Sequence, residues 1–408
     1  MLSAFFNKLF NRPPTQESFA QKVIKAARDS GFNGPLEYLP EEFRLRQGDR
    51  AYFNLHNAYR DYLQASKDLK ASVLNRYLAT LLASHKGTSA TFEQTRPLLR
   101  PVIRNLAMLE EIRLHHVHNE GWDSPFTVAH HPLGKDCVTL LAVDYPDTTS
   151  TLTKGPQDDW NIPLNEALSI ALDNLRDVTP DAFEQIIPGL YLGAWKDGYD
   201  TSRVLLPDVL QRARVKGRPV FMIPNRDVLM VTGDKDIEGL RHMIELSFEA
   251  MDKGRALSSQ IYTYNEHKII PFPIQEPELG ARLGDLQRLM LHGFYSAQKE
   301  FLDKIHEVWN EDVFVATHML YEQPENNGRT FSISAWTQGV ATSLPKTDRV
   351  VLVQPQENGP AVTQVVAWQE VESKLGELLC AEKDFYPPRY STLGFPGPEQ
   401  RSQLTPII

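Results

Sequence analysis

Five of the twelve histidines in this 408-residue chain fall within one short stretch, between residues 115 and 131. They are His115, His116, His118, His130 and His131. If His116-Val117-His118 forms a strand, its two imidazoles point to one face, and that arrangement suits a metal site. A hairpin could then supply His130 or His131 as a third ligand. As one alternative, this pattern predicts a metal-dependent hydrolase that uses the His116–His131 region.

The competing interpretation is a group of polar histidines on a loop and a strand edge. The sequence holds no second pair of spaced ligands and no His-Glu-x-x-His motif of the kind that binds zinc on a helix. Phosphate loops, dinucleotide fingerprints, kinase signatures and a Gly-x-Ser-x-Gly elbow are also missing from the sequence. We therefore favour a protein that is not an enzyme, and we expect no cofactor.

A turn with the sequence Lys-Asp-Gly-Tyr-Asp-Thr-Ser-Arg gathers polar side chains behind a glycine. Its candidate binding residues are Asp197, Tyr199, Asp200, Ser202 and Arg203. A serine beside acids and an arginine can form a nucleophile or an anion site at a helix N-terminus, but no histidine lies nearby in sequence to act as base. We favour a structural role, in which Asp200 or Thr201 caps the following helix and Arg203 pairs with a carboxylate.

A second candidate loop consists of Asn225, Arg226 and Asp227, between two apolar runs. These residue types suit a binding loop, although most such loops are only turns. Near the C-terminus, the segment 386–390 reads Tyr-Pro-Pro-Arg-Tyr and is typical of a polyproline ligand. The alternative for this segment is a tail that docks on its own protein through its aromatic rings.

The elements that position these residues follow from apolar spacing and turn signals. Because strands and helices do not alternate strictly, we predict an α+β fold of antiparallel sheets with packed helices. The predicted segments are an N-terminal arm (1–14), an α-β-β-β-α module (15–86), a strand-rich segment (87–160), a core α+β module (161–275), a long helix with antiparallel strands (276–383) and a proline-rich tail (384–408).

Several finer predictions concern single elements. They are one helix over 57–83, an extended segment over 95–104, strands at 125–129 and 137–143, a polar linker over 147–159, a helix near 370–380 and an extended tail from residue 384. In the first module, Thr15 is expected to cap a helix that ends before Gly31.

Composition limits the class of protein. With 52 acidic and 43 basic residues the formal charge is −9, which argues against a dedicated nucleic-acid binder. The two cysteines, Cys137 and Cys380, are too few for a disulfide scaffold, so a reducing, cytoplasmic compartment fits best. No apolar run reaches the length of a membrane span. The arm over residues 1–12 has an apolar helical face, which predicts at most a weak contact with a membrane surface.

Part of the chain resembles the YtpQ-like bacterial proteins, a family of unknown function. The resemblance covers roughly residues 95–272. It is carried by Arg-Pro-Val-Ile-Arg at 100–104, Asn-Leu-Arg at 174–176, Asp-Gly-Tyr-Asp-Thr-Ser-Arg at 197–203, Pro-Asn-Arg-Asp-Val-Leu at 224–229 and Ile-Tyr-Thr-Tyr-Asn-Glu at 261–266. It implies a cytoplasmic bacterial protein and assigns no activity. The first module and the residues after 272 are additions to the shorter members of that family.

A looser resemblance is to the fold of type III secretion chaperones, whose element order is α-β-β-β-α-β-β-α. The core module gives nearly that order, and the first module gives its front half. Domains of that fold bind proteins or form homo-oligomers. This analogy, together with the missing catalytic motifs, predicts a non-catalytic protein-binding, chaperone-like or adaptor-like function with a protein partner.

Overall fold

The computed structural model describes residues 14–40, 43–47, 51–85, 91–145, 148–266, 268–323 and 328–407. Its helices, with several antiparallel and mixed sheets, make up an α+β fold, as the sequence predicts. The arm over residues 1–12, with its predicted membrane-surface contact, lies outside the described residues. None of the helices in the described ranges combines the length and apolar character that a membrane span requires.

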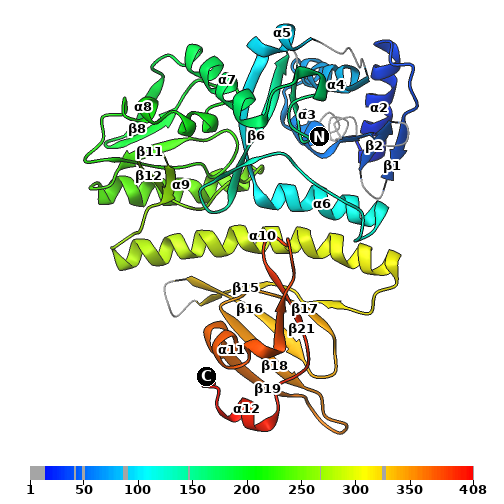
Figure 1. Cartoon of the computed structure of the whole chain (residues 1–408), viewed down its shortest axis with the longest axis vertical. Helices are drawn as coiled ribbons and strands as arrows, with labels where there is room; N and C mark the ends of the chain where they lie inside the picture. Colours follow the sequence, from blue (N-terminus) through cyan, green and yellow to red (C-terminus); the bar gives the residue numbers. More distant parts are fainter. Residues whose placement is uncertain are drawn as a thin grey trace, which may run out of the picture. The chain divides into compact units, whose positions relative to one another are not determined.

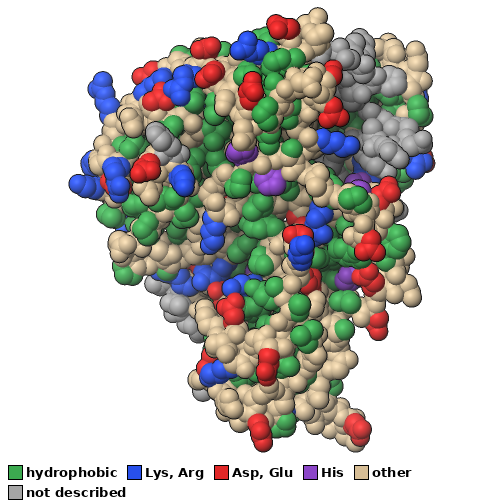
Figure 2. Space-filling model, viewed as in Figure 1, with side chains coloured by type: hydrophobic (Ala, Val, Ile, Leu, Met, Phe, Trp, Pro, Cys, Tyr) green, Lys and Arg blue, Asp and Glu red, His purple; other side chains and the backbone are tan. Residues whose placement is uncertain are grey.

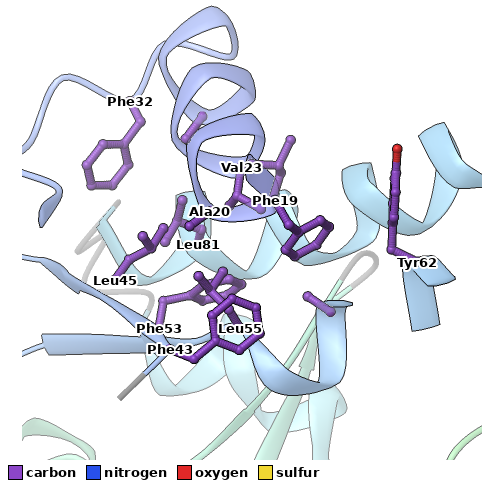
Figure 3. Close-up of a cluster of buried hydrophobic side chains, with 13 residues drawn as sticks. Phe19, Ala20, Val23, Phe32, Phe43, Leu45, Phe53, Leu55, Tyr62 and Leu81 are labelled. Carbon is purple, nitrogen blue, oxygen red and sulfur yellow. The ribbon is translucent and has the colours of Figure 1, made fainter. Parts of the chain in front are cut away.

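The chain divides into two compact units, each described by itself. Unit 1 comprises Met1–Arg100, Ala142–Thr151 and Asp158–Asn161. Its main elements are α2 (Gln16–Asp29), the sheet β1 (Glu37–Leu39), β2 (Arg44–Gln47) and β3 (Ala51–Asn54), and the helices α3 (His56–Gln64) and α4 (Lys70–His85). As predicted, Thr15 caps α2 by accepting from the backbone N–H of Ser18. Phe19, Val23 and Leu45 are among the side chains that fill the core between α2 and the strands (Figure 3).

Two predictions in unit 1 are wrong. The single helix over 57–83 is broken between α3 and α4, because Ala65 is extended and the carbonyl of Ser66 accepts from Leu69 and Lys70 in a turn. The polar linker over 147–159 contains strand β7 (Thr148–Thr151), which pairs antiparallel with the end of β6 (Cys137–Tyr145), and a short 3-10 helix at Asp158–Trp160. β-Branched threonines favour the strand despite their polarity.

Unit 2 comprises Pro101–Leu141, Leu152–Gln157 and Ile162–Ile408. Its larger sheet is antiparallel throughout, in the order β13-β12-β10-β11-β9-β8. The strands are β8 (Phe183–Ile187), β9 (Leu190–Gly193), β10 (Pro219–Met222), β11 (Met230–Gly233), β12 (Tyr262–Asn265) and β13 (Lys268–Pro271). Helix α9 (Ile237–Asp252) covers this sheet with a stripe that includes Leu240, Met243 and Ile244. Helix α7 (Leu164–Asp177) also belongs to this part of the unit.

Residues 92–145 differ from the prediction in two places and agree with it in a third. The segment 95–104 is extended only from β4 (Leu99–Asn105), because α5 (Phe92–Thr95) and a 3-10 turn at Arg96–Leu98 precede it. Residues 125–129 form no strand. The predicted strand at 137–143 is present as β6, and it forms a hairpin with β5 (His131–Leu133).

Helix α10 (Pro277–Trp309) runs through unit 2 and is the long helix predicted at the start of segment 276–383. Glu276 caps its first turn, and Asn310 ends it in the left-handed conformation. Figure 1 shows α9 and α6 (Leu106–Glu120) along one side of α10 and the C-terminal sheets along the other. Elements far apart in the sequence therefore meet on this one helix.

Two four-stranded sheets follow α10, in the orders β15-β16-β18-β19 and β14-β17-β21-β20. Their strands are β14 (Phe314–Val315), β15 (Met319–Gln323), β16 (Arg329–Thr337), β17 (Thr342–Pro345), β18 (Arg349–Gln354), β19 (Val362–Ala367), β20 (Leu379–Ala381) and β21 (Arg389–Thr392). Both sheets are mixed rather than antiparallel, because β16 pairs parallel with β18 and β14 pairs parallel with β17.

The C-terminal predictions need correction. The helix near 370–380 is shorter, since α11 (Trp368–Lys374) ends before a 3-10 turn and strand β20. The tail from residue 384 is not merely extended, because it contributes β21 to a sheet and ends in the short helix α12 (Pro398–Ser402). The backbone N–H of Ile407 then donates to the carbonyl of Val365.

Candidate functional site

His116 and His118 do not lie on the predicted strand, whereas His131 begins strand β5. His116 and His118 are both in helix α6, where two residues apart means nearly opposite faces. The ring of His116 contacts Ser124 Oγ at 3.0 Å, and the ring of His130 contacts the carbonyl of Val128 at 2.8 Å. His131 contacts Asn165.

No three side chains of His, Cys, Asp or Glu come together as metal ligands within the described ranges. The strand that the metal hypothesis requires is absent, because Asn105 caps a helix that continues through both histidines to Gly121. We therefore carry the metal-dependent hydrolase no further.

The turn from Asp197 to Arg203 is a closed structural unit. The Arg203 guanidinium is fully buried and donates to both carboxylate oxygens of Asp197, at 2.9 and 2.7 Å. It also donates to Thr179 Oγ1 at 3.0 Å and lies 4.4 Å from the ring centroid of Trp195. These contacts hold the pKa of Asp197 below its usual value, despite its partial removal from water. The predicted pairing of Arg203 with a carboxylate is confirmed.

The predicted capping role of Asp200 is wrong. Asp200 has helical backbone angles and makes no side-chain cap contact. Its carboxylate instead accepts from the backbone N–H groups of Trp195 and Lys196, at 3.0 and 3.3 Å, and so closes the loop in front of it. Tyr199 and Ser202 are also buried, so Ser202 is not placed as an exposed nucleophile.

The loop Asn225–Asp227 has different surroundings. Asn225 is buried and fixes the loop, because its amide donates to the carbonyl of Ala250 at 2.7 Å and its oxygen accepts from the N–H of Asp227. The N–H of Arg226 donates to the carbonyl of Arg255, and Asp227 forms an ion pair with the Arg255 side chain. Arg226 is thereby held against Arg255.

A third arginine, Arg104 at the end of β4, completes what we call the arginine cluster: Arg104, Arg226 and Arg255. Among the described residues, neither Arg104 nor Arg226 forms an ion pair with a carboxylate, and the Nε atoms of both are buried without a hydrogen-bond partner. One guanidinium nitrogen of Arg226 meets only the thioether sulfur of Met108, at 3.1 Å, and a thioether is a weak acceptor. The cluster therefore carries buried donors that no described residue accepts from.

The surroundings of the cluster disfavour the positive charges of its own arginines. Burial, with the positive charges of Arg226 and Arg255, lowers the pKa of Arg104 to about 9. Burial and the charge of Arg255 likewise lower the pKa of Arg226. Because a guanidinium stays protonated in proteins, such a site is stabilised by binding an anion rather than by losing a proton.

A cavity of about 200 Å³ adjoins the cluster, and we call it the arginine cavity. Arg226 and Arg255 line it, together with the first turn of α6 and the α10 side chains Phe294 and Phe301. The N-terminus of the 15-residue helix α6, capped by Asn105, lies at this wall and has no acidic residue in its first turn. Its partial positive charge adds to that of the arginines.

The carboxylates in the cavity wall do not neutralise the cluster. Glu110 is buried and is held by Arg113, at 2.8 and 2.9 Å, and by Gln298 at 3.2 Å. Glu111 makes no ion pair with Arg226 among the described residues, and its removal from bulk water raises its pKa more than Arg226 lowers it. Gln298 also accepts from Arg389 at 2.7 Å, so the cavity floor is a fixed hydrogen-bonded chain.

The sequence prediction found one member of this cluster and missed two. Arg226 is one of the candidate residues, Arg104 occurs only within a segment of the family resemblance, and Arg255 belongs to neither set. The sequence signal for Arg104 is its position at the end of an apolar strand, because a charge buried there needs a partner. The 386–390 segment is no free polyproline ligand, since Arg389 is fully buried in β21.

Comparison of the chain with protein-family models, with curated proteins and with solved structures gave no match.

Figure 2 shows acidic and basic side chains interspersed over much of the face in view. The charge of −9 therefore does not form one acidic field there. The concentrated positive charge described above is a local property of the arginine cluster.

Proposed function

We propose that the protein is a non-catalytic binding protein and that the arginine cavity receives a carboxylate side chain of a protein partner. One observation carries this proposal: Arg104 and Arg226 are charged, largely withdrawn from water and without a carboxylate ion pair among the described residues. An acidic side chain would supply both the missing charge and the missing acceptors, and guanidinium groups bind carboxylates in a bidentate manner.

The size and walls of the cavity favour a side chain over a large ligand. A volume of about 200 Å³ is below the range of about 300–1,000 Å³ that is usual for small-molecule pockets. The walls combine the arginines with the apolar faces of Phe294, Ala297 and Phe301. This mixture suits an acidic residue that is followed by apolar residues in a peptide segment.

We further propose membership of the YtpQ-like family for residues 95–272, and with it a bacterial, cytoplasmic protein. Support comes from the way three of the resembling segments meet. Arg104 belongs to the first segment, and its charge interacts with Arg226 of the Asn-Arg-Asp loop. Thr201 of the Asp-Gly-Tyr-Asp-Thr-Ser-Arg segment contacts the carbonyl of Arg226. The chaperone-like or adaptor-like role is part of the same proposal. Its support is element order, and a fold alone does not determine a function.

Labelled heptapeptide pools test the proposal. The central residue is fixed as Glu, Gln or phosphoserine, the other positions are randomised, and binding to the full chain is measured by fluorescence polarisation. We expect the Glu pool to bind at least tenfold more tightly than the Gln pool, and R226Q to remove the difference.

R214Q is the matched control, because Arg214 is exposed and lies outside the cavity. Equal binding of the Glu and Gln pools would overturn the proposal. Binding of the phosphoserine pool alone would also overturn it, because the cavity would then select phosphate rather than carboxylate.

A further inference from the structure

A second, larger cavity of about 450 Å³ lies elsewhere in unit 2, lined by α10, by residues of the C-terminal sheets and by the segments 135–136 and 259–260. It shares only Phe294 and Tyr386 with the arginine cavity. Its volume falls within the range of about 300–1,000 Å³ in which proteins hold small molecules. The candidate residues from the sequence, including Asp197, Arg226 and His131, are not among its walls.

One wall of this cavity is aromatic and rigid. Trp368 is 1% exposed and packs on the ring of Tyr390, with ring centroids 5.2 Å apart. Tyr295 is fixed by donating to the carbonyl of Pro388 at 2.6 Å and by stacking on His318 at 4.9 Å. With Phe294, these rings form a preorganised apolar surface that suits a planar ligand.

The two carboxylates in the walls are already occupied. Asp348 is held by Arg288 at 2.8 Å and accepts from both the N–H and the hydroxyl of Ser332. Asp136 is buried and accepts from the hydroxyls of Ser258 and Tyr262. Hydrogen bonds within the protein therefore fix both carboxylates in place.

Two lysines in the walls remain available. Lys135 is exposed and forms no ion pair with any described residue. Lys346 lies 3.4 Å from Glu372, in a pair whose two side chains are about half exposed, and such a pair holds the lysine weakly. Its ammonium also lies 5.9 Å from the ring centroid of Trp368. Both ammonium groups can therefore turn to an anion in the cavity.

These features define the charge of the ligand. Two lysines can neutralise one carboxylate, whereas a di- or triphosphate carries more negative charge than two ammonium groups can neutralise. The aromatic wall requires a bulky apolar body beside that single charge. We propose that this cavity binds a small aromatic monocarboxylate, with its ring against Trp368 and Phe294 and its carboxylate at Lys135 and Lys346. This proposal does not rest on the proposed peptide-binding function.

Isothermal titration of the full chain with 1-naphthylacetate tests the inference. The neutral 1-naphthylacetamide is the matched ligand, because it keeps the ring and removes the charge. We expect the acid to bind with micromolar affinity, the amide to bind at least tenfold more weakly, and K135Q/K346Q to bind the acid at least tenfold more weakly. Both lysines are surface-accessible, so the variant should fold, and circular dichroism checks this.

K304Q is the control variant, since Lys304 is exposed on α10 and is not among the cavity walls. It should bind the acid as the parent does. Equal binding of acid and amide, unchanged binding by K135Q/K346Q, or no binding of the acid at 5 mM would each overturn the inference. The peptide pools do not enter this experiment, so either proposal can fail alone.

Discussion

Arg203 on one side and Arg104 and Arg226 on the other are largely buried arginines of unit 2, but the groups around them differ. Arg203 is fully buried, but its guanidinium meets a bidentate carboxylate, a hydroxyl and an aromatic face. Arg104 and Arg226 have buried Nε atoms without an acceptor, and each lies close to other positive charges. The first arrangement has its partners within the protein, whereas we propose that the second is completed by a bound carboxylate.

This comparison separates a structural arginine from a binding one. Residue type does not distinguish them, because both loops combine arginine with aspartate and a turn-forming residue. The number of hydrogen-bond and ion-pair partners does distinguish them. The free-energy cost of burying a charged group is small when an opposite charge and acceptors surround it, and large when they do not. We therefore expect mutation of Arg203 to affect stability and mutation of Arg226 to affect binding.

The largest effect is expected for R203M. The change removes the buried guanidinium and leaves Asp197, 35% exposed, without its partner, which should lower the free energy of unfolding by about 3 kcal/mol. Urea denaturation measures the loss. R176Q is the control, because Arg176 and Asp208 form an exposed pair whose removal should cost about 0.5 kcal/mol. Equal losses in the two variants would contradict the structural role of Arg203.

D200A should have the next largest effect. Removing the Asp200 carboxylate leaves the N–H groups of Trp195 and Lys196 without their acceptor, at a cost of about 2 kcal/mol in unfolding free energy. D200N keeps one acceptor oxygen and should lose less than half as much. If D200N is as unstable as D200A, the loop is not closed by this carboxylate oxygen.

R226Q should change stability least among these substitutions, because it relieves repulsion within the arginine cluster. We expect a change within about 0.5 kcal/mol of the parent, in either direction. Raising sodium chloride from 20 to 500 mM should stabilise the parent more than R226Q, since salt screens like charges. Thermal unfolding at both salt concentrations measures this, and a loss above 1 kcal/mol in R226Q would assign Arg226 to the structural group instead.

The pKa values of the carboxylates beside Arg203 and beside Arg226 should be shifted in opposite directions. The pKa of Asp197 is lowered, so its contribution to stability is present above its usual value of 3.8 and is lost as the pH falls through its folded value. The pKa of Glu111 is raised above 4.5 because removal from water outweighs the charge of Arg226, so its ionisation opposes folding as the pH rises. Carboxyl-carbon NMR titration separates the two, and a Glu111 that titrates below Asp197 would reverse the comparison.

Much of the fold could be predicted because apolar periodicity and capping signals are local. Thr15 marks the start of α2, and the stripe from Leu283 to Ile305 marks α10. The errors arise where local signals compete. The helix over 57–83 breaks at a Ser-containing turn, and His116-Val117-His118 belongs to a helix because Asn105 caps it.

The candidate site was less predictable because charge balance depends on contacts between distant residues. Arg104, Arg226 and Arg255 are brought together by β4, by the β10–β11 loop and by the residues after α9. No sequence spacing shows that Asp227 forms its ion pair with Arg255 rather than with Arg226. The same holds for Arg389, whose partners lie on α10 and in two neighbouring strand segments.

We propose that the arginine cluster binds a carboxylate, and thermal unfolding in glutarate tests this claim most directly. The midpoint of the parent in 20 mM glutarate is compared with that in sodium chloride of equal ionic strength, and R104Q/R226Q is measured beside it. We predict that glutarate raises the midpoint of the parent above the chloride value and does not do so for the double variant. Equal glutarate stabilisation of the parent and R104Q/R226Q would contradict the claim.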